Sequence, residues 1–191
     1  MDIAGMLKRM LRAARFDTSL YKEVEKNKKL DREARNVVIL VVLLDGIGLA
    51  LAQALSTEGF NVGRALLRLA FGILVGLFVY YLWAYVTHLV ARSLYHARSD
   101  IGEVRRTIAY AQSPRVLAFL WFIPGIGPAL GTLGWLWALV AGIVAVGEAL
   151  ELTTGRAIVT VVVGWIVAFF LFWFLAFLVG IPFLMIAGVS A

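Results

Sequence analysis

A charged amino-terminal head precedes a series of long apolar stretches that fill the rest of the chain. The head, residues 1–36, mixes basic and acidic side chains. The apolar stretches lie at about 37–55, 69–90, 113–126, 129–147 and 157–181. A helix needs about 20 mostly apolar residues to cross roughly 30 Å of hydrocarbon. The pattern therefore predicts an all-α membrane protein, with a cytoplasmic head in 1–36 and a bundle of about five transmembrane helices in 37–191.

The stretch between Arg115 and Glu148 carries no charge, and it is too long for one straight span yet short for two full ones. In its middle, the segment PGIGP at 124–128 interrupts helical hydrogen bonding and favours a reversal. The residues assigned to this turn are Pro124, Gly125, Gly127 and Pro128. We predict a tight hairpin of two short helices. The alternative, a single kinked span, would move the carboxyl terminus to the cytoplasmic side.

The first fourteen residues have a helical amphipathic pattern. The apolar positions are Ile3, Met6, Leu7, Met10, Leu11 and Ala14, and the basic positions are Lys8, Arg9, Arg12 and Arg15. This pattern is typical of a helix that lies in the membrane interface, with its apolar stripe in lipid and its bases near anionic headgroups. The alternative is a stripe that packs on the protein's own cytoplasmic loop or on a partner subunit.

Composition excludes a water-soluble domain. Hydrophobic residues make up 62% and charged residues 16% of the chain, whereas soluble domains are about 45 to 50% apolar and about 25% charged. The absence of cysteine excludes a disulfide scaffold and thiolate-bound metal. The net charge is +6, and ten of the 18 Lys and Arg residues precede Val37. Because Lys and Arg concentrate on cytoplasmic segments, this charge predicts a cytoplasmic amino terminus without a cleavable signal, and no nucleic-acid partner.

Asp45 is the one acid deep inside a predicted span, where a charged side chain costs about 2.5 to 3.5 kcal/mol. It therefore faces protein or water, and small or polar residues including Gly48 and Gln53 lie on its side of the helix. Asp45 and Gln53 form a candidate polar or partner site, with either a transport role or a packing role. No base is expected at comparable depth, because the helix entry Ser113-Pro114 leaves Arg115 free to extend outward to the interface. An ion pair with Asp45 is thus not expected.

Small residues in the other apolar stretches mark faces where helices pack closely. Together with Gly48, the predicted helix-packing residues are Gly72, Gly76, Gly134 and Gly142. His88 and His96 stand eight residues apart, which is not the i, i+4 spacing of two ligands on one helix face. No metal site, cofactor site or catalytic residue is predicted, and the common hydrolase and phosphate-binding motifs are missing.

Several segments of the sequence, in their order along the chain, resemble the sequences of one known family. They are FDTSLYKEVEKNKKLDREARNVVILVVLLDGIG, RRTIAYAQSP, FIPGIGPALGTLGWLWALVAGIVAVGEAL and LTTGRAIVTVVVGW. Together they resemble the Yip family, the Ypt/Rab-interacting integral membrane proteins, in its prokaryotic branch, from Phe16 to about Gly180. The resemblance implies five membrane-spanning helices and a cytoplasmic amino terminus. Eukaryotic members bind small GTPases and share a cytosolic Asp-Leu-Tyr-Gly-Pro type motif. This chain lacks the motif, so GTPase binding is not expected.

Three functions remain open after this comparison. The first is a non-enzymatic Yip-like scaffold or adaptor that binds other membrane proteins or shapes the membrane. The second is an accessory subunit of a larger energy-converting or pigment complex, and the third is a small transporter or channel that uses Asp45. The expected partners are membrane lipids, including anionic headgroups, and other integral membrane proteins. The expected location is a prokaryotic cell membrane.

Overall fold

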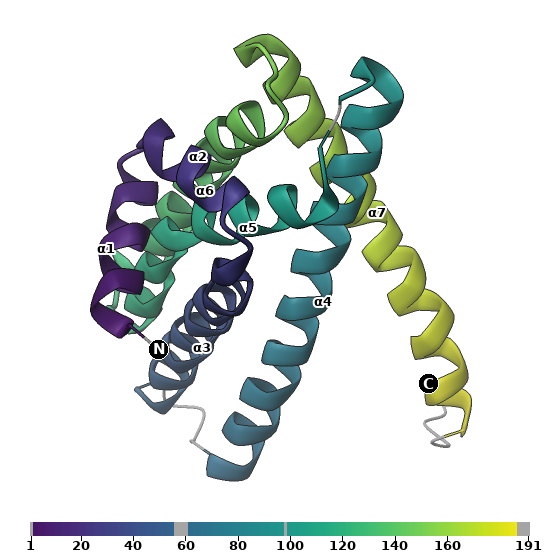
Figure 1. Cartoon of the computed structure of the whole chain (residues 1–191). Helices are drawn as coiled ribbons and strands as arrows, with labels where there is room; N and C mark the ends of the chain where they lie inside the picture. The colour runs from purple at the N-terminus through teal and green to yellow at the C-terminus, as the bar shows by residue number, and fades with distance from the viewer. Residues whose placement is uncertain (1, 56–60, 98, 187–191) are drawn as a thin grey trace.

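The structure is a computed structural model that describes residues 2–55, 61–97 and 99–186, and these residues form helices joined by short connections (Figure 1). The helices are α1 (Ile3–Ala14), α2 (Thr18–Lys26), η1 (Lys28–Leu30), α3 (Asp31–Ala54), α4 (Val62–Tyr95), α5 (Ile101–Ala111), η2 (Ser113–Phe122), α6 (Gly127–Ala149) and α7 (Thr154–Ile186). The prefix η marks a 3-10 helix. The end of the predicted region 37–191, residues 187–191, lies outside the described residues.

Among the described residues, four helices are long and apolar enough to cross a membrane. They are Lys28–Ala54, Ala65–Tyr95, Gly127–Ala149 and Thr154–Phe174. The predicted all-α membrane protein is therefore confirmed. The helices α3 and α4 begin before the apolar stretches 37–55 and 69–90 that indicated them, because polar and charged residues continue each helix. In α3, for example, the acidic residues Asp31 and Glu33 occupy the first turn, where their negative charges interact favourably with the positive end of the helix dipole.

The apolar segment 113–126 differs from its expected form. It was expected to be a short α-helix, but its residues Ser113–Phe122 form the 3-10 helix η2, with Pro114 in the first turn. Pro lacks an amide N–H, so the hydrogen bonding of α5 ends before it. At about 2 Å per residue, η2 extends roughly 20 Å, which is less than the roughly 30 Å of hydrocarbon. The chain then reverses through Gly125, whose φ of 83° suits glycine, and α6 returns beside η2.

The helix α5 was not expected, because the region between the second and third apolar stretches was interpreted as a cytoplasmic loop. A capping box between Asp100 and Glu103 starts α5, and most of its later residues are buried. It lies across the middle of the bundle in Figure 1 and contacts α2, α3, α4 and α6. A central helix thus joins the head to the membrane-spanning helices.

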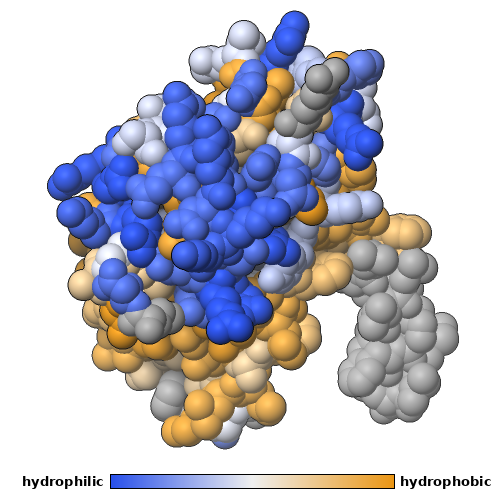
Figure 2. Space-filling view, in the orientation of Figure 1, coloured by the Kyte–Doolittle hydropathy of each residue, from blue (hydrophilic) through white to orange (hydrophobic). Residues whose placement is uncertain are grey.

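Hydrophilic residues gather over the upper half of the molecule and apolar residues over the lower half (Figure 2). In the same orientation, α3 runs downward, α4 upward, α6 upward and α7 downward (Figure 1). The last turns of α7 therefore lie on the same side as the end of α3 and the start of α4, away from α5. This arrangement agrees with the predicted hairpin at 124–128 rather than with a single kinked span. That the polar side is cytoplasmic stays a prediction from the charge distribution.

Candidate functional site

Asp45 forms an ion pair inside the bundle, contrary to the sequence-based expectation. Nη2 of Arg115 lies 3.4 Å from Oδ2 of Asp45, and the side chains are 14% and 20% exposed. Nη1 of Arg115 donates to Oε1 of Gln112 at 2.7 Å, and its guanidinium lies 3.8 Å from the centre of the Trp135 ring. The expectation was wrong because η2 carries Arg115 down beside the middle of α3. A partly buried carboxylate and a partly buried guanidinium thus join α3 to η2.

Close glycine contacts surround the ion pair. A Cβ at Gly48 would lie 2.5 Å from the carbonyl oxygen of Phe119, closer than real Cβ atoms come, so α3 approaches the η2 backbone at this residue. On the other side of η2, a Cβ at Gly134 would lie 3.0 Å from the carbonyl oxygen of Pro114. Glycine at these two positions lets α3 and α6 approach η2 from both sides, which brings Arg115 within reach of Asp45.

The remaining predicted packing residues lie at different interfaces. A Cβ at Gly76 would lie 2.6 Å from Val42 of α3, and one at Gly142 would lie 3.2 Å from the Trp83 ring of α4. Among the described residues, nothing lies within 4 Å of a Cβ at Gly72. Gln53 is half-buried near the end of α3. Gly76 and Gly142 therefore lie at contacts of α4 with α3 and α6.

The amphipathic helix α1 divides its apolar stripe between protein and the outside. Met6, Met10 and Ala13 are buried against the rest of the protein. The neighbouring stripe consists of Ile3, Leu7 and Leu11, each of which is between 50% and 58% exposed. The sequence left two alternatives open for this stripe, the membrane surface and the protein itself, and the structure divides the stripe between contact with protein and an exposed face.

Ion pairs and hydrogen bonds fix α1 to the bundle. Arg9 and Glu33 form a bidentate pair, with Nε–Oε1 and Nη2–Oε2 distances of 2.7 Å, and this carboxylate raises the pKa of Arg9 above its ordinary value. At the end of α1, Nε1 of Trp137 donates to the carbonyl oxygen of Ala14 at 2.8 Å. The hydroxyl of Tyr21 donates to the carbonyl oxygen of Ala13 at 3.2 Å. The exposed stripe of α1 is thus held in a fixed position on the bundle.

Two of the four bases predicted to contact headgroups instead pair within the protein. Arg9 pairs with Glu33, and Arg12 pairs with Asp17 at 2.7 Å and with Glu23 at 2.9 Å. The Ser19 hydrogen bonds and the Arg12 pair lower the pKa of Asp17 to about 2. The other two bases, Lys8 in α1 and Arg15 directly after it, are exposed. For these two, contact with headgroups stays a prediction.

Arg106 joins the head to α5, and the sequence interpretation had counted it only as a cytoplasmic charge. Its side chain is 2% exposed. Nε donates to the carbonyl oxygen of Val24 at 2.9 Å, Nη2 to that of Glu25, and Nη1 to Oδ1 of Asp31 at 3.0 Å. Val24 and Glu25 lie in the last turn of α2, where carbonyl groups lack partners within the helix. One guanidinium therefore caps α2 and binds the first turn of α3.

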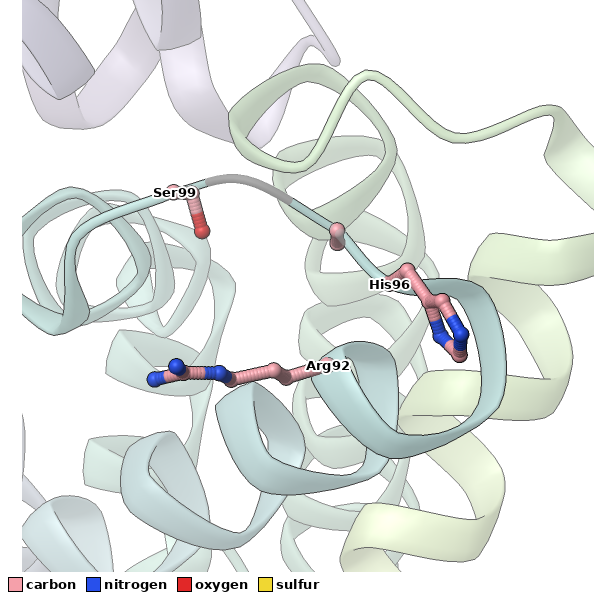
Figure 3. A pocket seen from close by; sticks show the side chains of 4 residues that line it. Arg92, His96 and Ser99 are labelled. Atoms are coloured by element: carbon pink, nitrogen blue, oxygen red, sulfur yellow. The ribbon is translucent and has the colours of Figure 1, made fainter.

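A cavity of about 450 Å³ lies where α4 ends, lined by Arg92, His96, Ala97 and Ser99. In Figure 3, the Arg92 side chain extends along the same side as Ser99, and the His96 ring points away from it. The His96 ring and the Arg92 guanidinium thus do not converge on one ligand position. Across residues 2–55, 61–97 and 99–186, no group of three or more metal-ligating side chains comes together.

The helices and their buried polar contacts define a multi-pass, all-α membrane protein with a polar head fixed to its bundle. The family model of the Yip1 domain matches residues 22–188, so the chain belongs to the Yip1 domain family and the resemblance found in the sequence is confirmed. Comparisons with curated proteins and with solved structures gave no match. The matched residues begin after α1, so the family match does not describe this helix.

Proposed function

We propose that this Yip1-family protein is a non-enzymatic membrane scaffold, and that it acts by shaping the lipid bilayer and by binding other integral membrane proteins. The family match supports a membrane scaffold or adaptor. The contacts of Asp45 support a structural role for this acid, because Arg115 pairs with it and Gly48 brings η2 against its helix. In the proposed orientation, the head lies in the cytoplasm, consistent with its positive charge.

The exposed stripe of α1 is the observation that carries the proposal. Full burial of a Leu or Ile side chain is worth about 1.5 to 3 kcal/mol, so burying the exposed halves of three such side chains contributes about 3 kcal/mol. Helices of this kind insert roughly 5 to 10 Å into the headgroup boundary. Because the pair of Arg9 with Glu33 fixes α1 to the bundle, insertion of α1 into the membrane surface adds area to one leaflet at a defined place beside the protein. Area added to one leaflet favours curvature.

Liposome reconstitution tests this function. The full chain is reconstituted at a series of protein-to-lipid ratios into vesicles of phosphatidylcholine and phosphatidylglycerol, and vesicle diameters are measured by electron cryomicroscopy. We expect mean diameter to fall as the protein ratio rises. The variant Ile3→Ser/Leu7→Ser/Leu11→Ser should lose this dependence while remaining folded, because these side chains project outward from the protein.

A matched control changes three exposed residues of the head outside α1, Thr18→Ala/Lys28→Ser/Lys29→Ser. This variant should remodel vesicles as the unaltered protein does. Equal remodelling by the α1 variant and the unaltered protein would contradict a shaping role for α1. No change of diameter with any of the proteins would contradict membrane shaping itself.

A further inference from the structure

A second cavity, separate from α1 and from the ion pair, lies where α4 meets α5. Its volume is about 340 Å³, at the lower end of the roughly 300 to 1,000 Å³ typical of small-molecule sites. The lining residues are Phe78, Tyr81, Leu82, Ala84 and Tyr85 of α4, with Ile101 and Arg105 of α5. The lining is therefore aromatic and aliphatic, with a single guanidinium at one place.

The cavity lies in the half of the hydrocarbon layer that is nearer the hydrophilic surface. From Leu69, where the second apolar stretch begins, α4 rises roughly 24 Å to Tyr85 at 1.5 Å per residue, within the roughly 30 Å thickness of the hydrocarbon layer. At this height α5 lies across the bundle (Figure 1), at the transition from apolar to hydrophilic surface (Figure 2). Phe78 lies one helical turn before Leu82, on the hydrocarbon side, so the cavity extends from the acyl-chain region toward the polar surface.

The charge at the polar end of the cavity is not balanced by the neighbouring acid. Oδ1 of Asp31 lies 3.0 Å from Nη1 of Arg106 and 3.5 Å from Nη2 of Arg105. One carboxylate thus faces two guanidinium groups, and it lies closer to the buried Arg106. Arg105 is 33% exposed. A positive charge therefore remains available at the cavity.

The position of Arg105 is fixed by α4. The hydroxyl of Tyr80 donates to the carbonyl oxygen of Arg105 at 2.7 Å, which anchors its backbone. The guanidinium carbon lies 5.6 Å from the centre of the Tyr81 ring, within the range of a cation–π contact. The group is therefore held beside the aromatic wall of the cavity.

We propose that this cavity binds one phospholipid with a net negative headgroup. Its phosphate pairs with Arg105, and its acyl chains lie along Phe78 and Leu82 and continue over the apolar surface of α4. Because Arg105 shares the single carboxylate of Asp31 with Arg106, its positive charge favours an anionic lipid over a zwitterionic one, whose quaternary ammonium is repelled by the same guanidinium. The site is distinct from the exposed stripe of α1, and it does not depend on membrane shaping.

Native mass spectrometry of the full chain, purified in detergent, tests the proposal. The protein is titrated with phosphatidylglycerol and separately with phosphatidylcholine carrying the same acyl chains. We expect tighter binding of phosphatidylglycerol, and a loss of about tenfold in its affinity for the variant Arg105→Gln, because one charge-assisted contact is removed. The variant Leu82→Trp, which fills the cavity and leaves Arg105 in place, should weaken binding of phosphatidylglycerol as well.

Arg92→Gln is the matched control for Arg105→Gln, since Arg92 is an exposed guanidinium near the end of α4 and does not line this cavity. It should leave binding of phosphatidylglycerol unchanged. Inorganic phosphate should not displace the bound lipid, because it lacks the acyl chains. Equal binding of the two lipids, full affinity in Arg105→Gln or Leu82→Trp, or displacement by inorganic phosphate would each overturn the proposal.

Discussion

Replacing Asp45 by Asn leaves the Arg115 guanidinium without its counter-ion inside the bundle. At the observed separation of 3.4 Å, two unit charges attract by about 5 kcal/mol at an effective dielectric constant of about 20. Desolvation of both groups offsets part of this attraction, and the separation exceeds the 2.7 to 2.9 Å typical of strong charge-assisted bonds. We therefore expect a coupling free energy of about 1 to 3 kcal/mol.

The single variants should cost more than this coupling. Asp45→Asn leaves a guanidinium that keeps only its contacts with Gln112 and Trp135, so we expect a loss of about 3 kcal/mol in the free energy of unfolding. Arg115→Gln leaves a carboxylate in the span, with a loss of similar size. The double variant should lose less than the sum of the two single losses, because neither charge then stays behind unpaired.

A double-mutant cycle measures this coupling. The four proteins are unfolded reversibly in mixed detergent micelles, and helix content is followed by circular dichroism. The matched control combines Asp45→Asn with Arg92→Gln, a distant exposed base whose effect should simply add. A coupling below about 0.5 kcal/mol between Asp45 and Arg115, the limit of ordinary additivity, would refute the assignment of this pair as a packing element.

Four further variants address helix packing and the head. Gly48→Ala should lower the free energy of unfolding by about 1 to 3 kcal/mol, because its Cβ would meet the η2 backbone. Gly72→Ala should leave the free energy of unfolding unchanged or raise it. Equal effects of the two variants on unfolding in detergent would contradict the close packing of α3 against η2. Arg106→Met should cost about 3 kcal/mol and speed amide exchange in α2, since it leaves buried carbonyls without donors; unchanged exchange would speak against the cap. Burial raises the pKa of Glu25, so its favourable contribution to the free energy of unfolding is complete below the ordinary pKa and is lost as pH rises through the raised pKa. Glu25→Gln should therefore raise the melting temperature at about pH 8 and not at about pH 4. A difference in melting temperature that does not depend on pH would be inconsistent with this cause.

The apolar pattern predicted α3, α4, α6 and α7, because continuous hydrophobicity over about 20 residues has few interpretations other than a membrane helix. It did not predict α5. The buried face of this helix includes Gly102, Arg106 and Thr107, which do not look like a core in sequence. The buried guanidinium of Arg106 has its partners on α2 and α3, distant in the chain, such as the carbonyl oxygen of Val24 and the carboxylate of Asp31. The hydroxyl of Thr107 donates to carbonyl oxygens of α5 itself.

The ion pair was missed for a related reason. The depth of Arg115 depends on where η2 begins and on how closely α3 and α6 approach η2 at Gly48 and Gly134. Neither of these follows from the local sequence. The amphipathic pattern of α1 did predict a helix with an apolar stripe. It gave no indication that Met6 and Met10 would pack on protein while the next positions stayed exposed, because that division depends on the bundle against which α1 lies.

The most direct test of the proposed function asks whether the exposed stripe of α1 lies in lipid. Because the chain contains no cysteine, Leu7→Cys and, on the basic side of the same helix, Lys8→Cys can each be labelled with an environment-sensitive fluorophore in liposomes. The account predicts blue-shifted emission at position 7 that brominated lipids quench, and water-exposed, unquenched emission at position 8. Equal, water-like emission at both positions would contradict insertion of α1 and with it the proposed mode of membrane shaping.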